Sequence, residues 1–110
     1  MALWTIEYWK SSDTGNDSVK KWLTKLTVEQ VDAVFLQLSR LENAGNELEL
    51  PHSKALGKGL FELREMQYGY RIYYGFHGKL IIVVVAAGDK TSQDKDIKIA
   101  RQRLSQIKKG

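Results

Sequence analysis

Two kinds of hydrophobic pattern divide the chain into strands and helices. Alternation of apolar and polar residues, which is typical of half-buried β-strands, occurs in residues 3–9, 60–67 and 70–76. Residues 79–87 are almost continuously apolar, as expected for a strand in the middle of a sheet. The second half of the chain therefore predicts three successive strands, with tight turns at Tyr68-Gly69 and at His77-Gly78.

Apolar residues at intervals of three and four predict three helices. The first two form a helical hairpin within residues 17–45, and Thr27 with Gln30 makes a capping box at the start of the second. The last helix begins near Thr91 or Ser92, and its apolar stripe consists of Ile97, Ala100, Leu104 and Ile107.

The resulting element order is β-α-α-β-β-β-α. This order predicts an α+β fold, in which a helical hairpin and a C-terminal helix pack on a mostly antiparallel sheet. A chain of 110 residues suits one hydrophobic core, so we expect a single domain over residues 1–110.

The first predicted hairpin brings scattered polar residues together. With Tyr68-Gly69 as its turn, Arg64 lies opposite Tyr73, and directly opposite residues share a face of the sheet. The other face is apolar and is expected to face the core. The polar face carries Glu62, Arg64, Met66, Arg71 and Tyr73.

The second hairpin adds a further cation to this face. With its turn at His77-Gly78, Arg71 lies opposite Val84, and Lys90 follows the last strand at the same end of the sheet. Arginine presents a fixed fork of donors that matches a phosphate group, and a tyrosine can stack on a base or donate a proton. The face therefore indicates phosphate binding, although a solvated sheet face on which Arg64 pairs with Glu62 or Glu65 would show the same pattern.

Composition narrows the possible chemistry. The chain has no cysteine, no cluster of metal-ligating residues and no glycine-rich phosphate loop, so neither a metal nor a cofactor is expected. It has 17 Lys and Arg against 13 Asp and Glu, and this net charge of +4 suits a polyanionic partner. No signal peptide is evident, and the apolar run Leu80–Ala87 is too short to cross a bilayer, which predicts a soluble cytoplasmic protein.

Several phrases of the chain, taken in order, resemble the RelE/ParE toxin superfamily, and especially its phage-derived, HigB-like branch. The phrases are "LENAG", "KALGKGLFELR", "YRIYYGF", "DKT" and "IARQRL", and the resemblance covers residues 17–107. It implies the toxin of a type II toxin–antitoxin system. RelE-like and HigB-like members cut messenger RNA on the ribosome, whereas ParE-like members poison DNA gyrase.

The resemblance also assigns residues. Arg71 falls on the superfamily's phosphate-contacting arginine, Arg64 on a second basic position, and Lys90 where RelE-like toxins carry a basic residue. The chain departs from RelE at Leu60 and Glu62, which lie in a strand where RelE has lysines, and it lacks the tyrosine of the C-terminal region.

A metal-independent endoribonuclease needs phosphate donors, a general base and a general acid. Arg64 and Arg71 are the expected phosphate donors. The candidate bases are Glu62 and His52, and the candidate acids are Lys90 and Tyr73. The expected RNA contacts are Lys54, Lys58, His52 and Lys95. The implied partners are a helix-turn-helix, HigA-like antitoxin, the ribosome and messenger RNA.

Three functions are compatible with these residues. The leading hypothesis is a ribosome-dependent endoribonuclease that inhibits translation. The alternatives are a ParE-like poison of DNA gyrase, in which the arginines bind a protein or DNA surface, and an inactive nucleic-acid-binding module. The arginine–tyrosine set on one sheet face favours the first.

Overall fold

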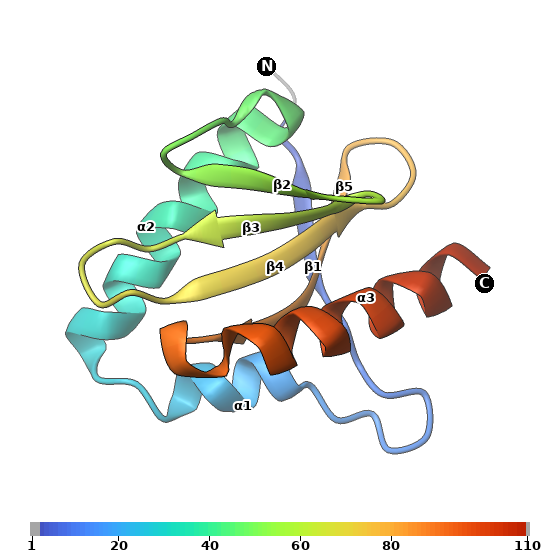
Figure 1. Cartoon of the computed structure of the whole chain (residues 1–110), viewed down its shortest axis with the longest axis horizontal. Helices are drawn as coiled ribbons and strands as arrows, with labels where there is room; N and C mark the ends of the chain where they lie inside the picture. Colours follow the sequence, from blue (N-terminus) through green and yellow to red (C-terminus); the bar gives the residue numbers. More distant parts are fainter. Residues whose placement is uncertain (1–2, 110) are drawn as a thin grey trace.

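The computed structural model describes residues 3–109 and has a five-stranded sheet at its centre (Figure 1). The strand order across the sheet is β1-β5-β4-β3-β2, with β1 parallel to β5 and every other neighbouring pair antiparallel. The strands are β1 (Thr5–Tyr8), β2 (Ser53–Gly57), β3 (Leu60–Arg64), β4 (Arg71–Phe76) and β5 (Ile81–Gly88). The predicted α+β class with a mostly antiparallel sheet is confirmed.

Helices cover both faces of the sheet. Helices α1 (Ser18–Thr24) and α2 (Val28–Ala44) lie on one face, and α3 (Gln93–Lys109) crosses the other (Figure 1). Two short 3₁₀ turns complete the chain, η1 at Gly45–Glu47 and η2 at Lys90–Ser92. The capping box predicted at the start of α2 is present. The cap before α3 is different, because the carboxylate of Asp89 accepts the backbone N–H of Thr91.

Each face of the sheet has its own apolar core. Under α1 and α2, Val34, Leu38 and Leu41 pack on Leu63, Ile72 and Tyr74. Under α3, Ala100 and Leu104 pack on Leu60, Tyr73 and Val85. The face predicted to be polar is therefore partly a core face, because α3 packs mainly on β4 and β5 and also buries Leu60 and Glu62 of β3, while Arg64 stays partly exposed (Figure 1).

One strand was not predicted. The predicted element order has no strand between the helical hairpin and β3, but residues Ser53–Gly57 form β2 at the edge of the sheet. Its short pattern is hard to recognise, because Lys54 and Ala55 are both exposed although they point to opposite faces.

The first hairpin has a longer turn than predicted. Arg64 pairs with Arg71 and Glu62 with Tyr73, which is a shift of two residues from the predicted register. The reason is the carboxylate of Glu65, which accepts the backbone N–H groups of Gln67 and Tyr68 and stabilises a wider loop. A shift of two preserves the side on which each residue lies, so the predicted faces are correct.

The second hairpin differs more. Its turn is closed by the N–H of His77 and the carbonyl of Ile81, and Arg71 pairs with Gly88 instead of Val84. A bulge in β5 leaves Val85 without a partner in β4, and Arg103 of α3 donates to the carbonyl of Val85 at 2.8 Å. The longer turn and the bulge together account for the shifted register.

Candidate functional site

The ends of four strands place the predicted residues in one row. Arg64 pairs with Arg71, and Arg71 pairs with Gly88, the last residue of β5. On the other side, the N–H of Arg64 donates to the carbonyl of His52 at 2.8 Å, just before β2 begins. These backbone pairings therefore align His52, Arg64, Arg71 and Gly88 across four neighbouring strand ends, with Lys90 two residues beyond the row.

A buried carboxylate holds the two arginines. Glu62 has no exposed surface, and its Oε1 accepts a hydrogen bond from Nε of Arg64 at 3.0 Å. Its Oε2 lies 3.6 Å from Nε of Arg71 and accepts a hydrogen bond from the amide of Gln93 at 3.0 Å. Arg64 is therefore hydrogen-bonded to Glu62, whereas Arg71 is held as an ion pair whose buried Nε has no hydrogen-bond partner among the described residues.

The two arginines border a pocket. It has a volume of about 290 Å³ and lies between Pro51 and the β3–β4 loop. The side chain of Arg64 is 33% exposed and that of Arg71 is 18% exposed, and Nη1 of Arg71 donates to the carbonyl of Gly69. Two partly exposed guanidinium groups at one concavity can bind an anion of the size of a phosphate. The pocket residues are Pro51, Arg64, Glu65, Met66, Gly69, Tyr70 and Arg71.

Tyr73 lies beneath this cluster and not on its surface. It pairs with Glu62, is fully buried under α3, and its hydroxyl has no hydrogen-bond partner among the described residues. Burial raises the pKa of Tyr73, and the negative charges of Glu62 and Asp96 raise it further. The hydroxyl therefore stays protonated at neutral pH, and the ring offers no exposed face on which a base could stack.

The predicted bases and acids differ in their exposure and in their hydrogen-bond partners. Both carboxylate oxygens of Glu62 have hydrogen-bond partners and are buried, so in this arrangement Glu62 contacts Arg64 and Gln93 and presents no exposed oxygen to the solvent. His52 is partly exposed, and its Nδ1 lies 3.5 Å from a terminal nitrogen of Arg40 on α2. Lys90 is exposed in η2 and makes no ion pair within residues 3–109.

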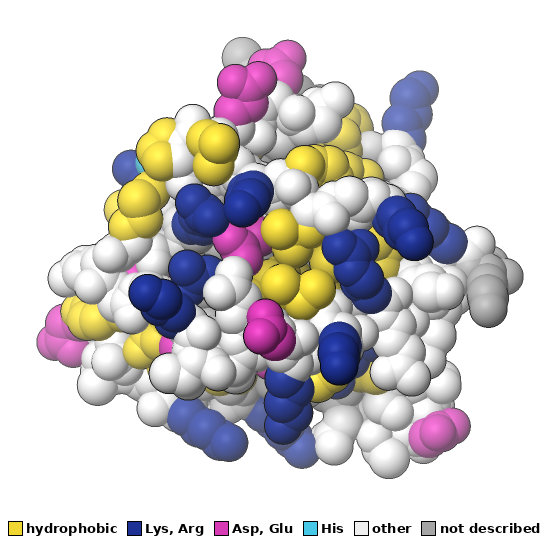
Figure 2. Space-filling view, viewed as in Figure 1, with side chains coloured by type: hydrophobic (Ala, Val, Ile, Leu, Met, Phe, Trp, Pro, Cys, Tyr) yellow, Lys and Arg dark blue, Asp and Glu magenta, His cyan; other side chains and the backbone are white. Residues whose placement is uncertain are grey.

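The predicted RNA contacts are spread along the same side of the molecule. Lys54 pairs with Glu62 across β2 and β3 and is exposed, so it flanks the arginine cluster. Lys95 is exposed in the first turn of α3, two residues after Gln93. Lys58 is at the far end of β3, in the β2–β3 turn, where a different pocket lies. Figure 2 shows Lys and Arg side chains distributed over this face with apolar atoms between them.

Gln93 is a site residue that the sequence did not reveal. Its amide donates to Glu62 across 31 positions of sequence, and it is the first residue of α3. A glutamine at a helix start has no distinctive pattern, so only the packing of α3 on the sheet identifies this contact.

Within residues 3–109, no group of metal-ligating side chains is close enough together to hold a metal ion. In the same part of the chain, none of the helices combines the length and the apolar character that a membrane span requires.

Comparison with known proteins adds a family and a relative. The profile of the family described as "Phage derived protein Gp49-like" matches residues 21–105. An uncharacterised protein of Haemophilus influenzae is 35% identical over 82 residues, which are 73% of this chain and 79% of that protein.

Two solved structures have a similar fold. A double mutant of the E. coli toxin RelE in the free state superposes with a TM-score of 0.69 at 14% identity, over 92% of this chain and 97% of that one. The isolated E. coli RelE toxin gives a TM-score of 0.56 at 14% identity, over 87% and 98% of the two chains. At this identity the two structures establish the fold.

Proposed function

Since this chain belongs to the family of phage-derived Gp49-like proteins and has the fold of the toxin RelE, we propose that it is the toxin of a type II toxin–antitoxin system. We further propose that it acts in the cytoplasm as a HigB-like endoribonuclease that cuts messenger RNA on the ribosome. Its partner would be a helix-turn-helix antitoxin of the HigA-like kind. The order and spacing of its sequence phrases support the HigB-like assignment.

The observation that carries the proposal is the pair of arginines held by Glu62 at the edge of a pocket. A buried carboxylate holds one guanidinium group by a hydrogen bond and the other by an ion pair before any substrate arrives. Donors that are already in place need no rearrangement when charge develops on a phosphate, and this is the main source of electrostatic catalysis. Arg64 and Arg71 are therefore proposed to bind the scissile phosphate.

The chemistry needs no metal. A base takes the proton of the ribose 2′-hydroxyl, the 2′-oxygen attacks phosphorus, and the bond to the 5′-oxygen breaks as an acid protonates that oxygen. The products are a 2′,3′-cyclic phosphate and a free 5′-hydroxyl. His52 is our proposed base, because its ring is partly exposed whereas the carboxylate of Glu62 is buried. Lys90 is the proposed acid, because it is exposed, and Tyr73 is the alternative acid beneath Glu62.

Two exposed lysines are suited to guide the RNA strand. Lys54 flanks Glu62 on the open edge of the sheet, and Lys95 follows Gln93 on α3. Both are ammonium groups without ion pairs within residues 3–109. We propose that they contact phosphates on either side of the cleaved bond.

The test is primer extension on a translated messenger RNA with the wild type and with Arg71→Lys and Arg71→Ala. Arg71→Ala should reduce cleavage by about a hundredfold or more, since it removes one donor to the transition state. Arg71→Lys should restore cleavage only in part, because an ammonium group has no bidentate fork. Expression of the wild type alone should arrest bacterial growth, and Arg71→Ala should relieve the arrest.

The control is Lys21→Ala, an exposed cation on α1 away from the arginines, which should cleave and arrest growth like the wild type. Soluble yield and thermal melts show whether each variant is folded. Cleavage by Arg71→Ala at the wild-type rate would remove this site from the mechanism. A wild type that spares messenger RNA but inhibits supercoiling by gyrase would replace the nuclease with the ParE-like activity.

A further inference from the structure

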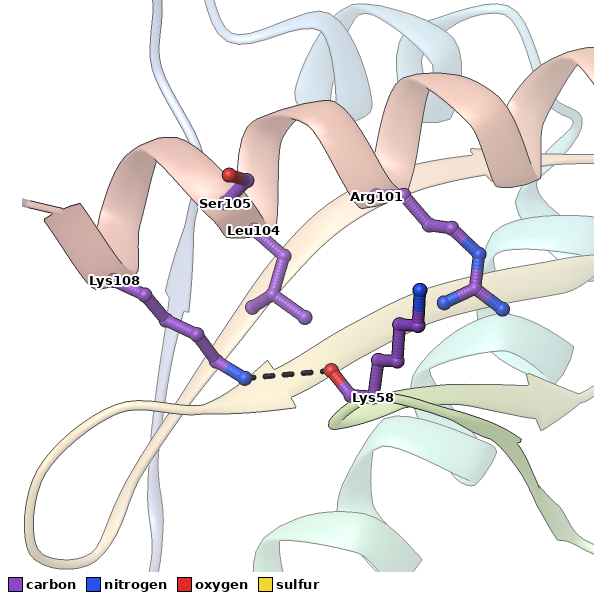
Figure 3. A pocket seen from close by; sticks show the side chains of 5 residues that line it. All are labelled: Lys58, Arg101, Leu104, Ser105 and Lys108. Carbon is purple, nitrogen blue, oxygen red and sulfur yellow. Dashed lines mark hydrogen bonds between the residues drawn. The ribbon is translucent and has the colours of Figure 1, made fainter.

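A second pocket lies at the other end of the same face, between α3 and the β2–β3 turn (Figure 3). Its volume is about 330 Å³, slightly larger than that of the arginine pocket. The buried Leu104 points from α3 into the space between the cations, and the basic residues surround it. The pocket is lined by Lys58, Arg101, Leu104, Ser105 and Lys108.

The three cations of this groove lack acidic partners. Arg101 donates to the carbonyls of Leu56 and Gly57, and Lys108 donates to the carbonyl of Lys58. None of these cations makes an ion pair in the portion of the chain that the structure describes, in which Glu62 is the only carboxylate that pairs with a cation. Their positive charge is therefore uncompensated at the rim of an apolar floor.

The backbone fixes one of these cations in place. Lys58 has a φ of 56°, between Gly57 at 92° and Gly59 at 83°, so three consecutive residues adopt the left-handed region. A lysine rarely adopts this conformation, and such strain persists only where surrounding contacts hold it. The hydrogen bonds from Arg101 and Lys108 to this turn supply those contacts, and they keep Lys58 at the mouth of the groove (Figure 3).

The lining favours a protein segment over RNA as the occupant. Single-stranded RNA sites stack bases on aromatic rings, and none of the described residues that line this groove is aromatic. Aliphatic surface surrounded by unpaired cations is complementary to leucine or isoleucine side chains flanked by carboxylates. An acidic amphipathic helix combines both features.

We propose that this groove docks an acidic segment of a partner protein, with aliphatic side chains over Leu104 and carboxylates on Lys58, Arg101 and Lys108. The partner's identity rests on the proposed function: in a toxin–antitoxin pair, the segment belongs to the antitoxin. The groove is separate from the arginine pocket, so docking there leaves Arg64 and Arg71 as they are in the free protein.

The test measures binding of a labelled synthetic helix that carries leucines on one face and glutamates beside them. The test variant is Lys58→Asn/Lys108→Gln, because asparagine tolerates a positive φ and both changes leave the core intact. The control is Lys21→Gln/Lys25→Gln on the opposite side of the sheet, with the same change in net charge. The test variant should bind the helix roughly tenfold more weakly, and the control should bind like the wild type.

Two further probes sharpen the result. A peptide of the same composition with its leucines scattered around the helix should bind much more weakly than the amphipathic one. Equal binding of both peptides, or equal losses in both double variants, would overturn the proposal. If single-stranded oligouridylate displaces the peptide and this competition depends on Lys58 and Lys108, the groove is a nucleic-acid track. That result would also overturn the proposal.

The proposed nuclease activity and the proposed docking groove can be contradicted independently of each other. A chain that binds the amphipathic peptide as expected but does not cut messenger RNA would contradict the nuclease and support the groove. A chain that cuts messenger RNA but ignores the peptide would contradict the groove alone.

Discussion

Glu62 determines what the two arginines can do. Alone, Arg64 and Arg71 on adjacent strands would repel each other, since like charges directly opposite destabilise a sheet. The buried carboxylate compensates both through its two oxygens. Removal of one partner from a buried ion pair costs roughly 3–5 kcal/mol, and less here because the arginines are partly exposed. Arg71→Ala should therefore reduce stability as well as the proposed phosphate binding, contrary to what a solvated sheet face would predict.

Tyr73 gives a prediction that depends on pH. Its pKa in the folded protein is above the unfolded value of about 10, so its contribution to stability is complete below that pH and is lost as pH rises above it. In Tyr73→Phe this loss is absent. Relative to the wild type, the variant should gain about 1 kcal/mol in free energy of unfolding between pH 9 and pH 11, as measured by urea denaturation.

The same variant, Tyr73→Phe, distinguishes a role of Tyr73 in the core from a role as the catalytic acid. At neutral pH the hydroxyl has no hydrogen-bond partner among the described residues, so its removal should leave stability unchanged or slightly higher. If Tyr73→Phe is stable but no longer cleaves RNA, Tyr73 is the acid and Lys90 is not. If the gap between the two proteins is constant with pH, Tyr73 is not the buried phenol described above.

Strands and helices show which parts of the structure the sequence could predict. Alternation identified the faces of β3 and β4 correctly, because a side chain's face depends only on its parity along the strand. The register was wrong, because it depends on turn length, and Glu65 and the bulge at Val85 both alter that length. Two-residue turns were expected at sites where the chain uses wider ones.

The candidate site was predicted only in part for the same reason. Arg64, Arg71 and Glu62 share the predicted face, and the correct register makes the two arginines direct neighbours. Burial of Tyr73 and Glu62 was not predictable from the hairpin, since it requires α3 to cross that face. Gln93 joins the cluster through the same packing.

The junction between β5 and α3 is a sensitive element. A Cβ on Gly88 would collide with the carboxylate of Asp96 and would lie 2.5 Å from Oγ of Ser92. Gly88→Ala should therefore destabilise the protein by about 1–3 kcal/mol, the usual cost of an overpacked site. It should also reduce RNA cleavage, because Gly88 pairs with Arg71 and the junction sets the position of α3.

A double variant tests the cause of that loss. Asp96→Ala removes the colliding carboxylate together with its hydrogen bond from Ser92. In urea denaturation, Gly88→Ala/Asp96→Ala should be more stable than the sum of the single losses predicts, by about 1 kcal/mol or more. Strict additivity would show that Gly88 is needed for another reason.

At the scale of the whole molecule, one face of the sheet serves stability and the other carries both a core and the two proposed sites. Helices α1 and α2 close the first face, whereas α3 closes only part of the second (Figure 1). The open remainder has the arginine pocket at one end and the groove beside Lys58 at the other. An RNA site and a protein-docking site can therefore coexist on a small domain without overlapping.

The cations around the arginine pocket predict how RNA binding depends on salt. If the arginine pair neutralises the scissile phosphate and Lys54 and Lys95 neutralise one flanking phosphate each, the logarithm of the binding constant should fall with the logarithm of salt concentration with a slope of about −2. The measurement is fluorescence anisotropy of a short 2′-O-methyl RNA, which binds but cannot be cleaved, between about 50 and 200 mM salt.

Lys54→Gln, an exposed change outside the buried cluster, should reduce the slope by about 0.7. Lys25→Gln, on the side of the sheet covered by α1, removes the same charge and should leave the slope unchanged. Equal changes in both variants would mean that net charge alone attracts RNA and that the arginine pocket does not bind its backbone.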